Sequence, residues 1–336
     1  MNQALHFTSL KNFTPLQFSD FEIDKRIKVV SLFSGCGGMD LGLRGGFDFL
    51  GEHYQRNSFD IIWANDFNAA ACRSYKRNIG PEIICGDIWK LLPQIPSIAD
   101  IVVGGFPCQD ISVNGKGLGV DGPKSGLYRA MVKVVEKIQP KIFIAENVKG
   151  LLMKHNKDSL SRVIEDFSNL GYDVSYYLFQ AADYGVPQTR ERVIIIGTLP
   201  SIKKFVAPPK VKSEKQWVTA KDAISDLAHV EENASFSHVW SRAKRSPDQG
   251  GRQLRADRAA YTMRAECHGN IQFHYDLDRR ISMREAARFQ SFPDDFVFDA
   301  KLRETERQVG NAVPPVLAWH IAQSVENMLD VSAKGS

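Results

Sequence analysis

Long hydrophobic runs and paired cysteines are both missing from this chain. No apolar stretch approaches the ~20 residues that a membrane-spanning helix needs. Residues 1–24 contain no basic segment followed by an apolar core, so we expect no signal peptide. The five cysteines form no Cys-x-x-Cys pair and no zinc-like spacing, which argues against a disulfide framework and against a metal site. We therefore expect a cytoplasmic protein that contacts no membrane and binds no metal.

An excess of charge of one sign is also missing. Lysine and arginine total 43 against 39 acidic residues, a formal net charge of +4, which by itself is only a weak indication of a polyanionic partner. The 43% of hydrophobic and 24% of charged residues are typical of a globular protein and exclude a disordered or collagen-like chain. A length of 336 residues leaves room for two domains.

Short apolar runs alternate with helical patterns in the first two thirds of the chain. The runs are residues 28–33, 61–66, 82–87, 100–106, 141–147, 174–179 and 192–198. Each is rich in Val, Ile or aromatic residues, as strands buried on both faces should be. Residues 127–138 and 160–170 between them have apolar residues at helical spacing. The alternation predicts an α/β fold with a doubly wound, mostly parallel, Rossmann-like sheet.

The pattern changes after Thr198. Residues 199–217 are rich in Pro and Lys, and between Arg242 and Arg264 seven basic residues face two acidic ones. Helical patterns return at 282–290, which we expect to pack between the domains rather than to touch a ligand, and at 314–329. We predict one domain from residues 1–198 plus 306–336 and a smaller, irregular domain from residues 199–305.

A glycine-rich turn follows the first predicted strand. Gly35, Gly37 and Gly38 allow backbone amides to approach a ligand, although the alternative is that they only permit a tight turn. A dinucleotide-binding G-x-G-x-x-G motif needs a third glycine where this chain has Asp40, which argues against NAD.

Two acidic residues follow the next two strands. Asp66 ends the second strand, where an acid binds ribose hydroxyls, and Asp87 follows the third, within reach of an adenine edge. Either residue alone is more often a helix cap. Together with the glycine-rich turn they favour an adenosine cofactor, and S-adenosylmethionine fits best because the turn is not built for a pyrophosphate.

Reactive side chains occur at three further strand ends. Cys108 follows the fourth strand in a turn, although a buried structural cysteine is the alternative; residues 109–122 behind it are our candidate for a lid. Glu146 ends the fifth strand. Arg190 and Arg192 share one side of an extended segment, unless they form a solvated cluster with Glu191.

An ordered set of motifs carries a family resemblance. The motifs are FSGCGG (33–38), the acid at Asp66, GDI (86–88), GFPCQ (105–109), ENV (146–148), QTRER (188–192), REAARFQSFP (284–293) and QVGNAVPP (308–315). In this order they resemble the DNA (cytosine-5)-methyltransferases of bacterial restriction–modification systems. The resemblance implies methyl transfer from S-adenosylmethionine to C5 of a flipped cytosine in double-stranded DNA. It also implies a monomer of the bacterial cytosol, paired functionally with a restriction endonuclease but in no required stable complex.

The resemblance also implies roles for single residues. Cys108 would attack C6 of cytosine, Glu146 would engage N3 and the exocyclic amine, and Arg190 and Arg192 would hold the flipped base and its surroundings. The implied cofactor contacts are Phe33, Gly35, Gly37, Gly38, Asp66, Phe67, Asp87, Ile88, Pro107, Leu127, Asn311 and Val313. Ser31 and Phe67 depart from the family pattern, in which an acid and a tryptophan are frequent at these positions.

The segment of residues 199–305, most of which lies outside the family motifs, is expected to read DNA. Residues 199–305 would be the target-recognition domain and hinge, with Arg245 and Arg252 on phosphates. Arg264, His268, Asn270 and Gln272 are residue types that read base edges, and Gln109 and Ser112 would also contact DNA.

Three alternatives stay open beside this interpretation. A transfer-RNA methyltransferase would carry a Cys-Phe-Thr tripeptide, which is absent. A non-catalytic DNA-binding relative would lack Cys108 or Glu146, and both are present. A nicotinamide oxidoreductase would need the glycine that Asp40 replaces.

Overall fold

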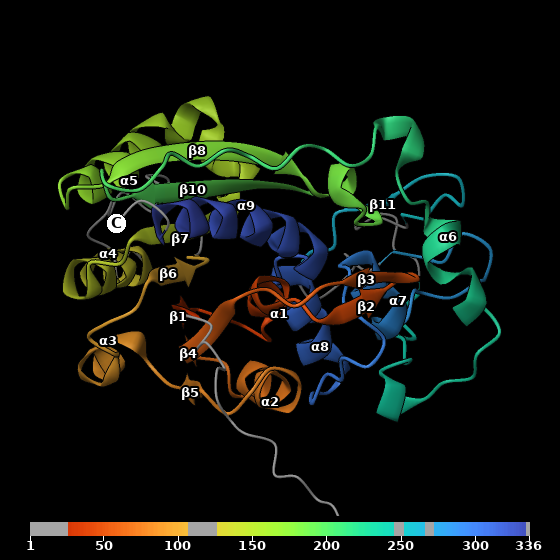
Figure 1. The fold of residues 1–336 in the computed structure, drawn as a ribbon. Coiled ribbons are helices and arrows are strands. Elements are labelled where there is room, and N and C mark those ends of the chain that lie inside the picture. Colours follow the sequence, from red (N-terminus) through yellow and green to blue (C-terminus); the bar gives the residue numbers. More distant parts are fainter. Residues whose placement is uncertain (1–25, 107–125, 245–251, 266–271, 334–336) are drawn as a thin grey trace, which may run out of the picture.

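A seven-stranded sheet forms the centre of the structure. The computed structural model describes residues 26–106, 126–244, 252–265 and 272–333. The strands are β1 (Ile27–Leu32), β4 (Phe59–Asp66), β5 (Ile83–Cys85), β6 (Ile101–Gly104), β7 (Ile142–Val148), β8 (Asp173–Gln180) and β10 (Glu191–Thr198). Their order is β5-β4-β1-β6-β7-β10-β8, from bottom to top in Figure 1. Only β10 runs antiparallel to its neighbours, β7 and β8. All seven predicted strands and the mostly parallel sheet are confirmed.

Helices cover both faces of this sheet. One hydrophobic layer joins Ile27 and Val29 of β1 to helices α1 (Gly38–Arg44), α2 (Ala69–Asn78) and α9 (Pro315–Ala333). The other joins Val30 and Leu32 to helices α3 (Ile88–Leu91), α4 (Gly126–Ile138) and α5 (Lys157–Ser168). Because side chains alternate along a strand, one short apolar segment supplies both layers. The chain thus returns at α9 to the sheet with which it began.

The edge strand β8 corrects one expectation. Predicted as buried on both faces, it instead leaves Tyr176 and Leu178 more than two fifths exposed, while Tyr177 and Phe179 pack into the core. The strand pairs only with β10 and is antiparallel to it, and antiparallel strands commonly have one solvated face.

Several elements were not predicted. They are the hairpin of β2 (Phe47–Phe49) and β3 (Glu52–Tyr54), helix α2, α6 (Ala220–Ile224), α8 (Leu302–Asn311), and the parallel pair of β9 (Gln188–Thr189) and β11 (Ala260–Tyr261). Most of these elements are short, and α2 and α8, although amphipathic, contain few large apolar side chains and so do not stand out as apolar runs. α6 and β11 lie to the right of the sheet in Figure 1, with helix α7 (Met283–Phe289).

Buried arginines stabilise the irregular region around α7. All seven residues of this helix are buried, as expected if residues 282–290 pack against other segments. Arg284 donates to the carbonyl oxygens of Phe236, Pro293 and Phe296, at 2.6–3.0 Å. The guanidinium of Arg288 pairs with the carboxylates of Asp226, at 2.6 Å, and Asp294, at 2.7 Å. Ionic and charge-assisted bonds therefore connect segments that have little regular secondary structure.

Two fully buried histidines in this region give the protein a pH-dependent stability. Burial lowers the pKa of His238 and His274. Below about pH 6.5 the unfolded chain binds protons at these positions while the folded protein resists them, so stability should fall as the pH falls. We expect the midpoint of urea unfolding to decrease between pH 7.5 and pH 5.5, and to decrease less in His238→Gln. The exposed His155 provides the control: His155→Gln should keep the wild-type dependence, and equal slopes in all three proteins would contradict the prediction.

Candidate active site at the carboxyl ends of the strands

The glycine-rich turn after β1 is held by Asp66. One carboxylate oxygen of Asp66 accepts the backbone N–H of Gly35 and the other accepts that of Asn68, both at 2.8 Å. Burial raises the pKa of Asp66, and the bonds from these amides partly oppose that shift. Phe33, at the start of the turn, is half-buried with a φ of 55°. The first and second predicted strands therefore deliver their candidate residues to one place.

The three glycines of the turn differ in their surroundings. A Cβ on Gly38 would lie 2.5 Å from the carbonyl oxygen of Val313, and one on Gly37 would lie 2.7 Å from Ile79. A Cβ on Gly35 would have no atom within 4 Å. Gly37 and Gly38 are thus required by close packing, while Gly35 faces open space. The same packing brings Val313, with the exposed Asn311 nearby in sequence, against the turn.

The end of β5 lies beside Asp66. The N–H of Gly86 donates to the backbone carbonyl of Asp66 at 2.9 Å. Asp87 caps α3, accepting the N–H of Trp89 at 3.0 Å, and Ile88 is only 2% exposed, in the core. The ring of Phe67, in contrast, is 79% exposed. A large exposed aromatic ring next to an acid suits a planar, partly polar ligand.

Leu127 lies near the same edge of the sheet. It is half-buried in the first turn of α4, and a Cβ on the preceding Gly126 would come within 3.1 Å of the Trp89 indole nitrogen. Pro107, another of the implied cofactor contacts, lies outside the described residues.

Glu146 and Arg192 form a buried ion pair at the ends of β7 and β10. The Nε of Arg192 lies 2.7 Å from Oε1 of Glu146, and both residues are less than a tenth exposed. Burial lowers the pKa of Arg192 and the carboxylate of Glu146 partly restores it. A Cβ on Gly105, just after β6, would lie 3.0 Å from Oε2 of Glu146. A solvated arginine cluster with Glu191 is therefore wrong: Glu191 pairs with Lys149 instead.

Asn147 is a site residue to which the sequence gave no role. Its amide nitrogen donates to the backbone carbonyl of Phe106 at 3.0 Å, and the residue is 2% exposed. This bond fixes the chain directly before Pro107 and Cys108. Cys108 itself, with Gln109 and Ser112, lies outside the described residues. The motif ENV contained the only indication of Asn147.

Arg190 joins three backbone segments. Its guanidinium donates to the carbonyl oxygens of Met263, Gly310 and Ala312, at 2.8, 2.9 and 3.0 Å. The side chain is 1% exposed, and burial lowers its pKa well below the usual value. The terminal nitrogens of Arg190 are thus occupied by backbone, and its expected role in holding the flipped base and its surroundings stays a prediction.

The proposed DNA-reading residues separate into two groups. Arg252 and Arg264 are exposed, and the guanidinium of Arg252 lies 5.9 Å from the centre of the Tyr261 ring. Gln272 is 2% exposed and donates to the carbonyl oxygen of Tyr261 at 3.0 Å, so its prediction as a base-reading residue does not fit its burial. Arg245, His268 and Asn270 lie outside the described residues.

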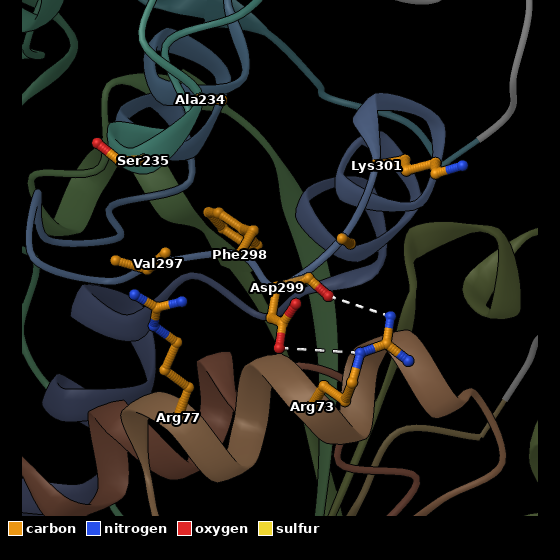
Figure 2. Close-up of a pocket in the computed structure, with 9 residues that line it drawn as sticks. Arg73, Arg77, Ala234, Ser235, Val297, Phe298, Asp299 and Lys301 are labelled. Atoms are coloured by element: carbon orange, nitrogen blue, oxygen red, sulfur yellow. Dashed lines mark hydrogen bonds and ion pairs between the residues drawn. The ribbon is translucent and has the colours of Figure 1, made fainter.

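A separate cavity of about 410 Å³ lies beside α2. Its lining residues are Arg73, Arg77, Ala234, Ser235, Val297, Phe298, Asp299, Ala300 and Lys301, and none of them is a predicted site residue. Figure 2 shows Arg73 turned toward Asp299, whose backbone carbonyl it binds at 3.3 Å. Arg77 points toward Val297 and the Lys301 ammonium points away from both arginines, so the three cations do not converge (Figure 2).

Two classes of site are not found in the part of the chain described above. Its His, Cys, Asp and Glu side chains form no group of three or more that is arranged to hold a metal ion. None of its helices has both the length and the apolar character that crossing a membrane requires.

Comparison with known proteins identifies the family. The C-5 cytosine-specific DNA methylase family matches residues 27–256 and 241–327. The chain is 36% identical over 332 residues to the type II methyltransferase M.NgoFVII of Neisseria gonorrhoeae, covering 89% of this chain and 86% of that protein. It is 33% identical to M.FnuDI of Fusobacterium nucleatum, covering 90% and 95%.

Solved structures agree on the fold. A prophage-encoded DNA modification methyltransferase from E. coli matches with a TM-score of 0.67 at 23% identity, over 90% of this chain and 99% of that chain. The S. pombe Dnmt2 methyltransferase matches with a TM-score of 0.65 at 19% identity, over 91% and 99%. The chain therefore belongs to the C-5 cytosine-specific DNA methylases, and it is a DNA (cytosine-5)-methyltransferase of the bacterial restriction–modification type.

Proposed function

We propose that this methyltransferase takes its methyl group from S-adenosylmethionine and adds it to C5 of a cytosine flipped out of a specific duplex sequence, through a transient bond between Cys108 and C6. The observation that carries the proposal is the buried pair of Glu146 and Arg192, next to the backbone that leads to Cys108. A charged pair removed from water can act on a base only if that base leaves the stacked duplex.

The chemistry requires a nucleophile because C5 of cytosine reacts poorly with a sulfonium methyl group. Addition of the Cys108 thiolate to C6 turns the ring into an enamine and raises the electron density at C5. Glu146 hydrogen-bonds N3 and the exocyclic amine as charge develops there, and Arg192 keeps the carboxylate in place. Removal of the C5 proton then expels the thiolate and releases 5-methylcytosine.

The residues around the glycine-rich turn fit S-adenosylmethionine. Gly35 leaves open space beside the turn, Asp66 presents a carboxylate next to it, and Phe67 offers an exposed ring for adenine. When bound, the cofactor supplies an electrophilic methyl group. We infer that Phe33, Asp87, Ile88, Leu127, Asn311 and Val313 complete its surroundings, with Pro107.

Asp66 provides a test of the cofactor site. Asp66→Ala removes a charged hydrogen-bond acceptor from both ribose and the turn, a loss of roughly 1.5–3 kcal/mol. The dissociation constant for S-adenosylmethionine should rise about 10–150-fold at ~1.4 kcal/mol per decade. Calorimetry on the folded variant measures it. Asp173→Ala, at an exposed site on β8, is the control, and equal affinities in the two variants would leave Asp66 as a helix cap with no part in cofactor binding.

Recognition of the target sequence is assigned to residues 199–305, with residues 1–198 and 306–336 as the catalytic domain. Exposed Arg252 and Arg264 suit contacts with phosphates and base edges respectively, and Arg245, His268 and Asn270 complete the proposal. We further propose a monomer that protects DNA from a cognate endonuclease without forming a stable complex with it.

A covalent trap tests the mechanism directly. A target duplex with 5-fluorocytosine should form a gel-stable adduct with the wild-type enzyme and S-adenosylmethionine, because fluorine at C5 blocks the final elimination. Cys108→Ala should form no adduct and retain less than about a hundredth of wild-type turnover, the lower end of the effect expected from losing the nucleophile. Transfer RNA in place of the duplex should accept no methyl group. An adduct formed by Cys108→Ala would contradict the assignment of Cys108 as the nucleophile.

A further inference from the structure

Two thiols lie beside residues 66 and 67, next to the candidate cofactor turn. Cys72, in α2, is 3% exposed, and its Sγ donates to the backbone carbonyl of Asp66 at 3.5 Å. Cys85, the last residue of β5, is exposed, and its Sγ donates to the carbonyl of Phe67 at 3.8 Å. The two sulfurs therefore bind carbonyl groups of consecutive residues. Burial first, and the neighbouring thiol of Cys85 second, raise the pKa of Cys72 to about 12.

The backbone keeps the two thiols in this position. Cys85 pairs with Asp66 in the β4–β5 ladder, and the N–H of Cys72 donates to the carbonyl of Asn68 at 3.0 Å. Both cysteines are thus fixed to residues 66–68, which also present the carboxylate that holds Gly35. No rearrangement of distant segments is needed to bring the sulfurs together.

We propose that Cys72 and Cys85 form a disulfide when a hydroperoxide oxidises the protein, and that this bond weakens cofactor binding at the adjacent turn. The second half rests on the proposed cofactor site; the first half does not. This oxidative modification site is separate from the nucleophile, Cys108.

The reaction balances in two steps. The exposed Cys85 sulfur attacks the peroxide, so that an S–O bond forms, the O–O bond breaks, and a sulfenic acid and one water or alcohol result. The Cys72 sulfur then attacks the Cys85 sulfur, forming the S–S bond, while the displaced hydroxyl leaves as water with the thiol proton. The two cysteines are oxidised and the peroxide is reduced. Because burial keeps Cys72 protonated and the thiolate is the nucleophile, Cys85 reacts with the peroxide first, and Cys72 gives its proton to the departing hydroxyl as it attacks.

The new bond changes the geometry next to Asp66. A disulfide requires an S–S distance of about 2.05 Å and Cβ atoms roughly 3.8 Å apart, whereas two sulfurs that are not bonded to each other lie farther apart. Closing that gap breaks the bonds to the carbonyls of Asp66 and Phe67 and pulls α2 toward β5. The carboxylate of Asp66 and the ring of Phe67 move with this backbone, so oxidised protein should bind S-adenosylmethionine at least about tenfold more weakly, or ~1.4 kcal/mol.

Peptide mapping tests the modification site. Full-length protein is treated with hydrogen peroxide, its remaining thiols are alkylated, and the digest is analysed by mass spectrometry. We expect a linked pair of peptides containing Cys72 and Cys85, lighter by two hydrogens and separated by dithiothreitol. Cys85→Ser, at the exposed position, should remove the link, while Cys267→Ser, which changes a thiol far away in the sequence, should keep it. Full alkylation of both cysteines after peroxide treatment, or a link from either to another cysteine, overturns the proposal.

Calorimetry tests the consequence. Peroxide should weaken S-adenosylmethionine binding by wild-type protein and by Cys267→Ser, reversibly with dithiothreitol, and leave Cys85→Ser unaffected. A mapped disulfide with unchanged affinity overturns the link to the cofactor site. If reduced wild-type protein binds no S-adenosylmethionine, it is the proposed cofactor that is wrong, and the peptide map still decides whether the dithiol is a modification site.

Discussion

Glu146→Gln should reduce the rate of methyl transfer by about 10²–10⁴-fold, the range for loss of a positioned acid–base group. Glutamine keeps the shape of the side chain but cannot carry the charge that Arg192 faces at 2.7 Å. Its amide can donate a hydrogen bond to cytosine N3 but cannot transfer a proton to it, as a protonated Glu146 can. Single-turnover kinetics at saturating duplex and S-adenosylmethionine measure the rate without the contribution of product release.

The chain offers a matched control for this experiment. Glu191 lies in β10 directly before Arg192, but its carboxylate pairs with Lys149, whose side chain is half exposed. Glu191→Gln should therefore turn over at the wild-type rate, since surface ion pairs contribute little. Urea unfolding of both variants separates a chemical loss from a structural one, because Glu146→Gln also leaves Arg192 buried without its partner. A Glu146→Gln enzyme that is folded and within tenfold of wild type would remove Glu146 from the mechanism.

The fold was largely predictable because its information is local. Each of the seven strands is a short run of Val, Ile and aromatic residues, and alternation with helical patterns specifies a wound sheet. Helix α8 was not predicted because its sequence, LRETERQVGN, is mostly polar. It is held in place by contacts with residues distant in the sequence, such as the hydrogen bond that the Asn68 amide donates to Glu304 at 3.0 Å. Tertiary contacts of this kind have no counterpart in sequence periodicity.

The site was predictable only where motifs named its residues. Glu146 and Arg192 lie in ENV and QTRER, and the structure brings them together. Gln272 was placed among DNA-reading residues because its type reads bases, yet its amide is buried against Tyr261. The region around it has little regular structure, so no period distinguishes inward from outward side chains. Residue type alone cannot say which way such a side chain points.

Arg190 shows how partners distant in sequence redefine a predicted residue. The three carbonyls that it binds belong to residues 73, 120 and 122 positions away. A Cβ on Gly310, one of these residues, would lie 2.3 Å from the backbone of Arg264, so the candidate DNA-reading segment rests directly on the QVGNAVPP motif. The hydrogen bonds of Arg190 to both segments stabilise this contact.

Removing these hydrogen bonds should destabilise the whole enzyme. Arg190→Met leaves buried carbonyl oxygens without donors, at roughly 1–3 kcal/mol for each unsatisfied group, offset in part because a buried charge is also removed. We expect a loss of about 3–5 kcal/mol in the free energy of unfolding, in the range for a broken buried network. Urea denaturation followed by circular dichroism measures it. Arg190→Lys should retain part of the stability, since one ammonium group can reach only some of the three carbonyls.

The control for Arg190 is an arginine whose side chain is exposed. Arg258 lies in the same basic segment as Arg252 and Arg264, and Arg258→Met should change stability by less than about 0.5 kcal/mol. If Arg190 acted only on bound DNA, both variants would unfold at the same urea concentration in its absence, and only duplex binding would separate them. The geometry gives the opposite order: Arg190→Met loses stability before any DNA is added, because its guanidinium is occupied by the protein's own backbone.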